Sequence, residues 1–234
     1  ARFPSHPRIA PTPDMEWRPP VHLAQPLPRR PVVVGFGPCG IFAALVLAQM
    51  GLRPIVLERG KTVRERTKDT WGLWRRGELN PESNVQFGEG GAGTFSDGKL
   101  YSQIKDPRHL GRKVMKEFVK AGAPEEILYV AHPHIGTFKL VKVVENMREQ
   151  IIALGGEIRF RQRVTDVLIE GQGLWLAIQG VLRHSIEGME VFTLYAQGHG
   201  FGAIATGWAE MAASGYAFCR SAITFFTTSA LADR

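Results

Sequence analysis

Residues 30–60, RPVVVGFGPCGIFAALVLAQMGLRPIVLERG, determine how the rest of this chain must be arranged. Residues 31–34 (PVVV) form a short β-branched run, which is typical of a strand buried on both faces of a parallel sheet. The apolar run 41–50 predicts a helix, and residues 54–57 (PIVL) predict a second strand with Glu58 at its end. Strand, helix and strand in this order predict an α/β fold with a parallel sheet.

Three glycines connect the first strand to the helix, in the pattern Gly35-x-Gly37-x-x-Gly40. Gly35 permits a tight turn, Gly37 lets the backbone approach a pyrophosphate, and Gly40 lets helix and strand pack closely. Unpaired N–H groups at the start of the helix attract phosphate. Glu58 is placed to accept hydrogen bonds from an adenosine ribose. The pattern predicts a Rossmann-like FAD- or NAD(P)-binding domain.

Composition limits the class of protein. A chain of 234 residues can bury one substantial core, and a formal net charge of +7 is mild. Much of that charge lies in segments of mixed sign, so we do not expect nucleic-acid binding as the main role. The two cysteines, Cys39 and Cys219, supply neither a disulfide framework nor a metal quartet. We therefore expect no metal and a reducing, cytoplasmic compartment.

The sequence divides into three parts. Residues 1–30 are a proline-rich lead-in without an apolar signal-peptide core, residues 31–170 form the dinucleotide fold, and residues 171–234 carry few charges. Because the chain begins with Ala1, we expect a fragment or a processed product. From residue 171 onward the pattern predicts neither sheet nor helix, so we expect an incomplete domain with an irregular C-terminal tail. His199 and several glycines interrupt its uncharged window, so no membrane span is expected.

A second glycine-rich stretch occupies residues 88–98, with five glycines in eleven residues. Such a loop cannot pack as an element of its own, but it lets backbone come close to a ligand. We expect its amides and the side chains of Thr94, Ser96 and Lys99 to face a cofactor or substrate. The alternative is a flexible surface loop.

Other segments predict elements around this core. Residues 108–122 and 139–154 have helical apolar spacing, and 157–169 alternates like a strand that either extends the parallel sheet or begins a hairpin. Trp71 and Trp74 share one face if their segment is helical. That face indicates a solvated helix with packed aromatic rings, or alternatively a nucleic-acid surface.

Several of these stretches together resemble bacterial, functionally uncharacterised FAD-dependent dehydrogenases or oxidoreductases. They are GFGPCG, the ERG at 58–60, RERTKDTWGLWRRGELNPESNVQFGEGGAGTFSDGKLYSQIKDPRHLG and AGAPEEILYVAHPHIGTFKL. The resemblance implies a glutathione-reductase-like FAD-binding fold. It places Glu58 at the adenosine ribose with Arg59 close by, and the backbone of Val164 at the adenine. It assigns the pyrophosphate to Gly35, Gly37, Pro38, Cys39 and Gly40, and the surroundings of pyrophosphate and flavin to Gly93, Thr94, Ser96, Lys99 and Leu100.

Members of that family continue into a substrate-side domain and return with a second flavin-contacting glycine motif. Neither is recognisable after about residue 170, so we expect a truncated or frame-shifted product. The family's N-terminal small domain is also missing, apart from what looks like its tail.

The leading hypothesis is an FAD-dependent oxidoreductase that acts on a small-molecule substrate, with NAD(P)H as a candidate electron donor. An NAD(P)-binding dehydrogenase and a non-catalytic nucleotide-binding remnant are the alternatives. The sequence pattern does not indicate which side chain could act as a catalytic acid or base. Cys39 lies at a helix N-terminus, where a thiol pKa falls, but without a CxxC partner we interpret it as a small residue tolerated in the turn.

Overall fold

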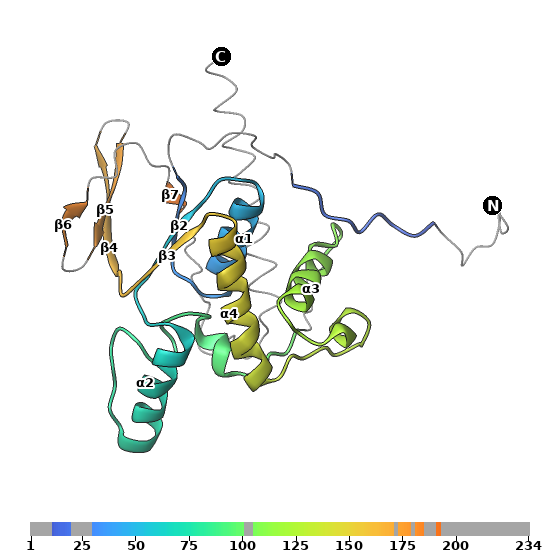
Figure 1. Ribbon diagram of the computed structural model, residues 1–234, viewed down its shortest axis with the longest axis horizontal. Coiled ribbons are helices and arrows are strands. Elements are labelled where there is room, and N and C mark those ends of the chain that lie inside the picture. The colour runs from blue at the N-terminus through green and yellow to red at the C-terminus, as the bar shows by residue number, and fades with distance from the viewer. Residues whose placement is uncertain are drawn as a thin grey trace, which may run out of the picture.

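A computed structural model describes residues 11–19, 30–100, 105–170, 173–178, 181–184 and 191–192, with side chains described in 11–19, 30–100 and 105–165. Its main sheet has four parallel strands in the order β3-β2-β1-β7. The strands are β1 (Val32–Val34), β2 (Ile55–Glu58), β3 (Glu157–Phe160) and β7 (Val191–Phe192), of which Figure 1 labels β2, β3 and β7. The predicted parallel sheet is confirmed, and β1 is one of its two central strands.

Helix α1 (Pro38–Gln49) connects β1 to β2, which lie in register from the Val32–Ile55 pair onward. Ten of its twelve residues are buried. A helix that is apolar all round must be covered on more than one side. The helix is followed by Gly51, which has φ +83°, and the Leu52 N–H donates to the Leu47 carbonyl at 3.0 Å.

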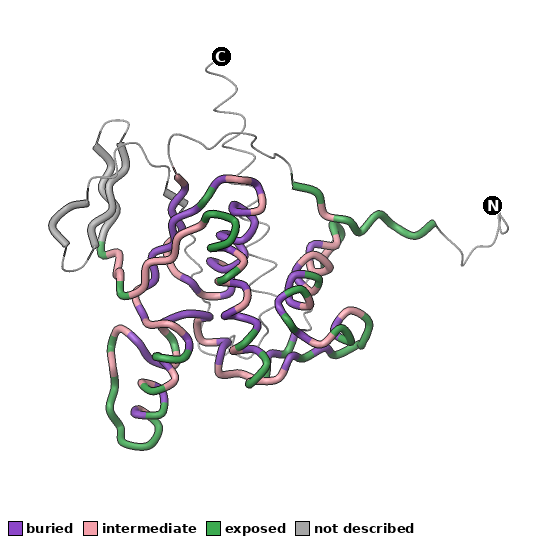
Figure 2. Tube along the Cα trace, viewed as in Figure 1, coloured by how far each residue is buried: buried purple, intermediate pink, exposed green. Residues whose placement is uncertain are grey.

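A long insertion separates β2 from β3. It contains α2 (Val63–Arg76), the 3₁₀ turn η1 (Ala92–Phe95), α3 (Leu110–Lys120), the 3₁₀ turn η2 (Glu125–Leu128) and α4 (Thr137–Ala153). The helices predicted at 108–122 and 139–154 are thus confirmed. Figure 2 shows mostly buried residues along α1 and exposed ones at the outer end of α2.

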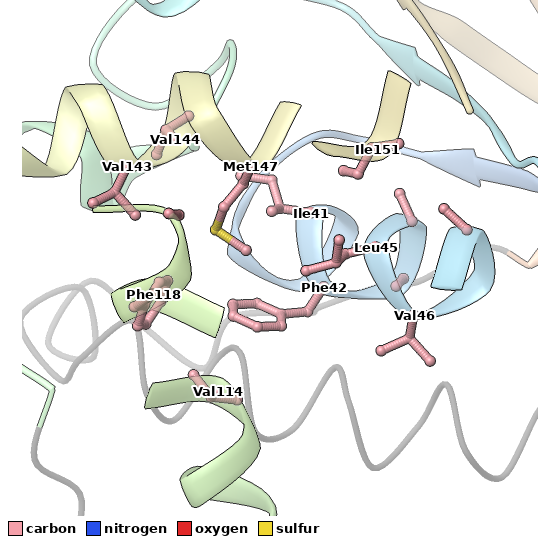
Figure 3. Packing of buried hydrophobic residues seen from close by; sticks show 14 of the residues in the cluster. Ile41, Phe42, Leu45, Val46, Val114, Phe118, Val143, Val144, Met147 and Ile151 are labelled. Carbon is pink, nitrogen blue, oxygen red and sulfur yellow. The ribbon is translucent and has the colours of Figure 1, made fainter. Parts of the chain in front are cut away.

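The core lies where α1, α3 and α4 meet (Figure 3). Phe42 from α1 contacts Phe118 from α3 edge to face, with ring centroids 5.3 Å apart. Met147 and Ile151 from α4 are also fully buried in this cluster. Each such side chain contributes roughly 1.5–3 kcal/mol through burial. This packing fixes α1, whose N-terminus carries the glycine turn.

The segment predicted as one strand at 157–169 is divided between two sheets. After β3, Arg161 adopts φ +59°, and β4 (Val164–Glu170) then pairs antiparallel with β5 (Gly173–Ile178). β5 pairs in turn with β6 (Val181–His184). Both alternatives for this segment therefore occur, one on each side of the kink.

The expectation of no sheet after residue 171 is wrong, because β5, β6 and β7 all follow it. The residues of β5, GLWLAI, are apolar at almost every position, so the alternation that marks a half-buried strand is absent. The remainder of 171–234, and with it the predicted irregular tail, lies outside the described residues. The three domain boundaries and the truncation stay predictions. In the described part of the chain, no helix has both the length and the apolar character needed to span a bilayer.

Candidate functional site

The glycine turn after β1 leads directly into the N-terminus of α1. Gly35 has φ +92° and donates its N–H to the Leu57 carbonyl at 2.8 Å, which holds the turn against the end of β2. Gly37 is the N-cap residue, Pro38 opens the helix, and no side chain caps it. The first helical turn also lacks an acidic residue. A phosphate would therefore meet the positive end of this helix without a competing carboxylate in that turn.

Gly40 sets the distance between α1 and the turn. A Cβ atom at this position would overlap the Gly35 carbonyl oxygen and lie 2.9 Å from the Gly35 carbonyl carbon. Any side chain would push the helix away from the strand. The role predicted for the third glycine of the motif is therefore visible in the packing.

Glu58 joins the end of β2 to the glycine turn. Its side chain is buried, and Oε2 accepts the Phe36 N–H at 2.6 Å while Oε1 accepts the Gly60 N–H at 2.7 Å. An ionised carboxylate has about four acceptor positions, so two backbone bonds leave capacity for ribose hydroxyls. Glu58 thus shapes the turn and still lines the neighbouring cavity.

The cavity has a volume of about 250 Å³ and lies beyond the carboxyl ends of β1, β2 and β3. Ligands of open α/β sheets bind at this edge. Five of the residues predicted to bind the cofactor line it: Gly35, Gly37, Glu58, Arg59 and Val164. The other lining residues are Val34, Leu57, Gln86, Phe87, Gly88, Gly91, Gln162 and Arg163.

Pro38, Cys39 and Gly40 lie in the first turn of α1 but do not line this cavity. The pKa expected for Cys39 from its helix position is wrong. Burial raises the pKa of its thiol to about 11, because the thiolate loses hydration. At neutral pH this side chain is a protonated, half-buried thiol.

The glycine-rich loop divides into two halves. Its first half reaches the cavity through Gly88 and Gly91, whereas Gly93, Thr94, Ser96, Lys99 and Leu100 do not line it. Thr94 is buried, and its hydroxyl donates to the Glu89 carbonyl at 3.2 Å. In the second half of the loop, the side chains of Thr94, Ser96 and Lys99, which were expected to face a ligand, therefore lie outside the cavity.

After Thr94, the predicted cofactor-binding residues of this stretch bond within the loop, pack in the core or face solvent. The Ser96 hydroxyl donates to the Gly93 carbonyl at 2.7 Å and accepts the Gly98 N–H at 3.1 Å. Leu100 is buried in the main core, and its N–H donates to the Pro133 carbonyl at 2.9 Å. Lys99 has an exposed side chain, 3.5 Å from Asp97.

A buried arginine that the sequence did not single out organises the first half of the loop. Arg66, from α2, is fully buried and donates through Nε to the Asn84 carbonyl at 3.0 Å and through Nη2 to the Val85 carbonyl at 2.7 Å. It also donates to the carbonyls of Gly88 and Glu89. Burial lowers its pKa to about 10, against the opposing effect of two carboxylates, so it stays charged at neutral pH.

Glu89 fastens the same loop to two helices. Its carboxylate accepts the Val63 N–H at the start of α2 at 2.7 Å and contacts Arg148 of α4 at 2.8 Å. Burial raises the pKa of this carboxyl. Arg66 was missed because it occurs in a charged segment whose pattern predicts exposure, and Glu89 because it lies among the glycines of the loop at 88–98. The one available signal was the loop itself. A long loop has many backbone carbonyls outside helices and strands, and those that are buried need hydrogen-bond donors.

The remaining predicted features lie away from the cavity. Trp71 and Trp74 share a face of α2, as expected, with ring centroids 5.8 Å apart and about half of each side chain exposed. Trp74 also contacts Phe95 edge to face. Within the described ranges, no cluster of three or more His, Cys, Asp or Glu side chains could hold a metal ion.

No family model matches the chain. An uncharacterized protein of Clostridium beijerinckii is 56% identical over 138 residues, which are 59% of this chain and 26% of that protein. The chain therefore spans about a quarter of the length of this curated relative.

Among solved structures, thioredoxin reductase of Lactococcus lactis has a TM-score of 0.36 and 14% identity, and the match covers 70% of this chain and 35% of that one. An L-amino acid deaminase from Proteus vulgaris has a TM-score of 0.41 and 14% identity, over 73% and 47% of the two chains.

Proposed function

We propose that this chain binds FAD and serves an FAD-dependent oxidoreductase whose substrate is a small molecule. One observation carries the proposal: the cavity brings together Gly35 and Gly37 after β1, Glu58 at the end of β2, and Val164 in the segment that follows β3. A volume of about 250 Å³ suits part of a dinucleotide, since pockets for whole ligands begin near 300 Å³.

The residues present fit the adenosine side of such a cofactor. Glu58 would accept ribose hydroxyls with the acceptor positions that the backbone leaves open. The uncapped N-terminus of α1 would hold the pyrophosphate, and Val164 would lie at the adenine. Bound flavin supplies hydride-transfer chemistry at its own ring. The residues of this chain bind and orient it.

An NAD(P)-binding dehydrogenase would use the same turn and carboxylate, so the geometry of Glu58 does not separate the two cofactors. What favours FAD is the resemblance of residues 60–140 to FAD-dependent dehydrogenases. A nucleotide-binding remnant without activity would keep the same cavity. NAD(P)H remains the candidate electron donor.

The test is the absorption spectrum of the purified chain, with the bound nucleotide released and identified by chromatography. We expect visible flavin absorption and released FAD. Glu58→Gln should weaken FAD binding about tenfold or more, because a charge-assisted hydrogen bond contributes about 1.5–3 kcal/mol.

Glu78→Gln is the matched control, because Glu78 is exposed and pairs with Arg76 outside the cavity. It should bind FAD like the unmodified chain. Recovery of a nicotinamide nucleotide without flavin would contradict the proposal. If the folded Glu58→Gln variant bound FAD with unchanged affinity, Glu58 would not contribute to FAD binding.

A further inference from the structure

Two arginines on the rim of the cavity share one carboxylate. Arg59 follows β2, Arg163 follows β3, and both line the cavity. Glu82, in the loop after α2, accepts Arg59 Nε at 3.0 Å through Oε2 and Arg163 Nη1 at 2.8 Å through Oε1. Each carboxylate oxygen therefore serves a different arginine. Arg59 is held further because its guanidinium lies 3.8 Å from the centroid of the Phe87 ring.

This arrangement balances the charge of the rim. Both guanidinium groups pair with Glu82, and the buried Glu58 lines the same cavity. Without Glu82, the arginines would present their donors to any anion near the ribose. With Glu82 in place, a new anion must compete with a carboxylate for the donors that Arg59, through Nε and Nη2, and Arg163, through Nη1, already give it.

A phosphate on the ribose 2′ oxygen is such an anion. A phosphate monoester carries close to two negative charges at neutral pH. Glu58 is the residue expected at the ribose, so this phosphate would come close to a buried negative charge. A free 2′ hydroxyl would instead donate a hydrogen bond to the same carboxylate.

We propose that Glu82 is a specificity-determining residue: by occupying Arg59 and Arg163, it makes this site select adenine dinucleotides with a free 2′ hydroxyl and reject those with a 2′ phosphate. This inference rests on the proposed function, since it requires the nucleotide to bind in this cavity. The selection against a 2′ phosphate then has two causes: Glu82 holds the two arginines, and Glu58 carries a negative charge near the ribose.

The test uses two ligands that differ only in the phosphate in question, ADP-ribose and 2′-phospho-ADP-ribose. Their affinities are measured by calorimetry on protein from which bound nucleotide has been removed under native conditions. The unmodified chain should bind ADP-ribose at least about tenfold more tightly. Glu82→Gln keeps the size of the side chain and removes its charge. It should improve binding of the phosphorylated ligand about tenfold, with a gain that shrinks as salt rises.

Glu78→Gln again serves as the control and should leave both affinities unchanged, because Glu78 does not touch either arginine of the rim. If Glu82→Gln weakens both ligands by the same factor, Glu82 is merely structural and the inference fails. Should that variant not fold, equal affinity of the unmodified chain for the two ligands overturns the inference without it. If the unmodified chain binds neither ligand, the proposed function fails first.

Discussion

The turn at 35–40 and the loop at 88–98 are both rich in glycine, but their glycines serve different purposes. In the turn, Gly40 is needed because helix and strand backbones meet there. In the loop, a Cβ at Gly88 would lie 2.6 Å from Arg66 Cδ, so the glycine makes room for a buried side chain of the protein itself. Glycine content alone therefore does not indicate a ligand. The group that occupies the freed space distinguishes the two cases.

The largest expected effect comes from removing the centre of the loop. Arg66→Met leaves the carbonyls of Asn84, Val85 and Gly88 without a buried donor, so we expect a loss of about 3–5 kcal/mol in the free energy of unfolding, measured with urea. Arg64→Met is the control on the same helix. Arg64 has an exposed side chain and forms an ion pair with Glu145, so its loss should cost less than about 1 kcal/mol. Equal losses would mean that the loop is not built around Arg66.

The next effect concerns reactivity in the turn. Because burial raises the pKa of Cys39 from an ordinary 9.0 to about 11, its thiolate fraction at neutral pH should be about 100-fold lower than that of an exposed cysteine. Alkylation in a Cys219→Ser background should be correspondingly slow, and its rate should rise about tenfold for each unit by which the pH increases toward 11. Unfolding in urea should abolish the protection. Rapid alkylation of the native chain would show that the helix N-terminus dominates the thiol after all.

A smaller effect is expected where the turn meets the helix. Gly40→Ala should lower the free energy of unfolding by about 1–3 kcal/mol, because the new methyl group overlaps the Gly35 carbonyl. Gly72→Ala in α2 is the matched control. Its Cβ would meet the ends of the Arg76 and Glu78 side chains and no backbone atom outside the helix within 4 Å, so the better helix propensity of alanine should stabilise the protein by up to about 1 kcal/mol. If Gly40→Ala left the free energy of unfolding unchanged, close backbone contact would not be the reason for glycine at this position of the turn.

The smallest effect tests the second half of the loop. Thr94→Val deletes a buried hydroxyl that donates to the Glu89 carbonyl, which should cost about 1 kcal/mol of stability in thermal unfolding. Nucleotide affinity should stay within about twofold, because Thr94 does not line the cavity. A tenfold loss of affinity with unchanged stability would place Thr94 at the ligand, as the family resemblance implies.

The features that the sequence predicts well are those with local causes. β1, α1, β2 and the position of Glu58 follow from spacing within thirty-one residues, and all four are found where expected. The roles of Arg66 and Glu82 could not be predicted, because each depends on segments that only the tertiary fold brings together. β5 was missed because a uniformly apolar segment has no period, and β6 and β7 were missed because four and two residues are too few to show one. The kink at Arg161 was missed because no glycine marks it.

One consequence of the long insertion concerns the order of folding. β1, α1 and β2 are neighbours in sequence, but β2 pairs with β3 across about a hundred residues, from Ile55 to Glu157. Closing so large a loop costs chain entropy before the pairing compensates for it, so distant contacts form slowly. The wall at Gln162, Arg163 and Val164 exists only after that closure. We therefore expect the adenine end of the cavity to be completed in the last kinetic phase of refolding, after the glycine turn has already formed.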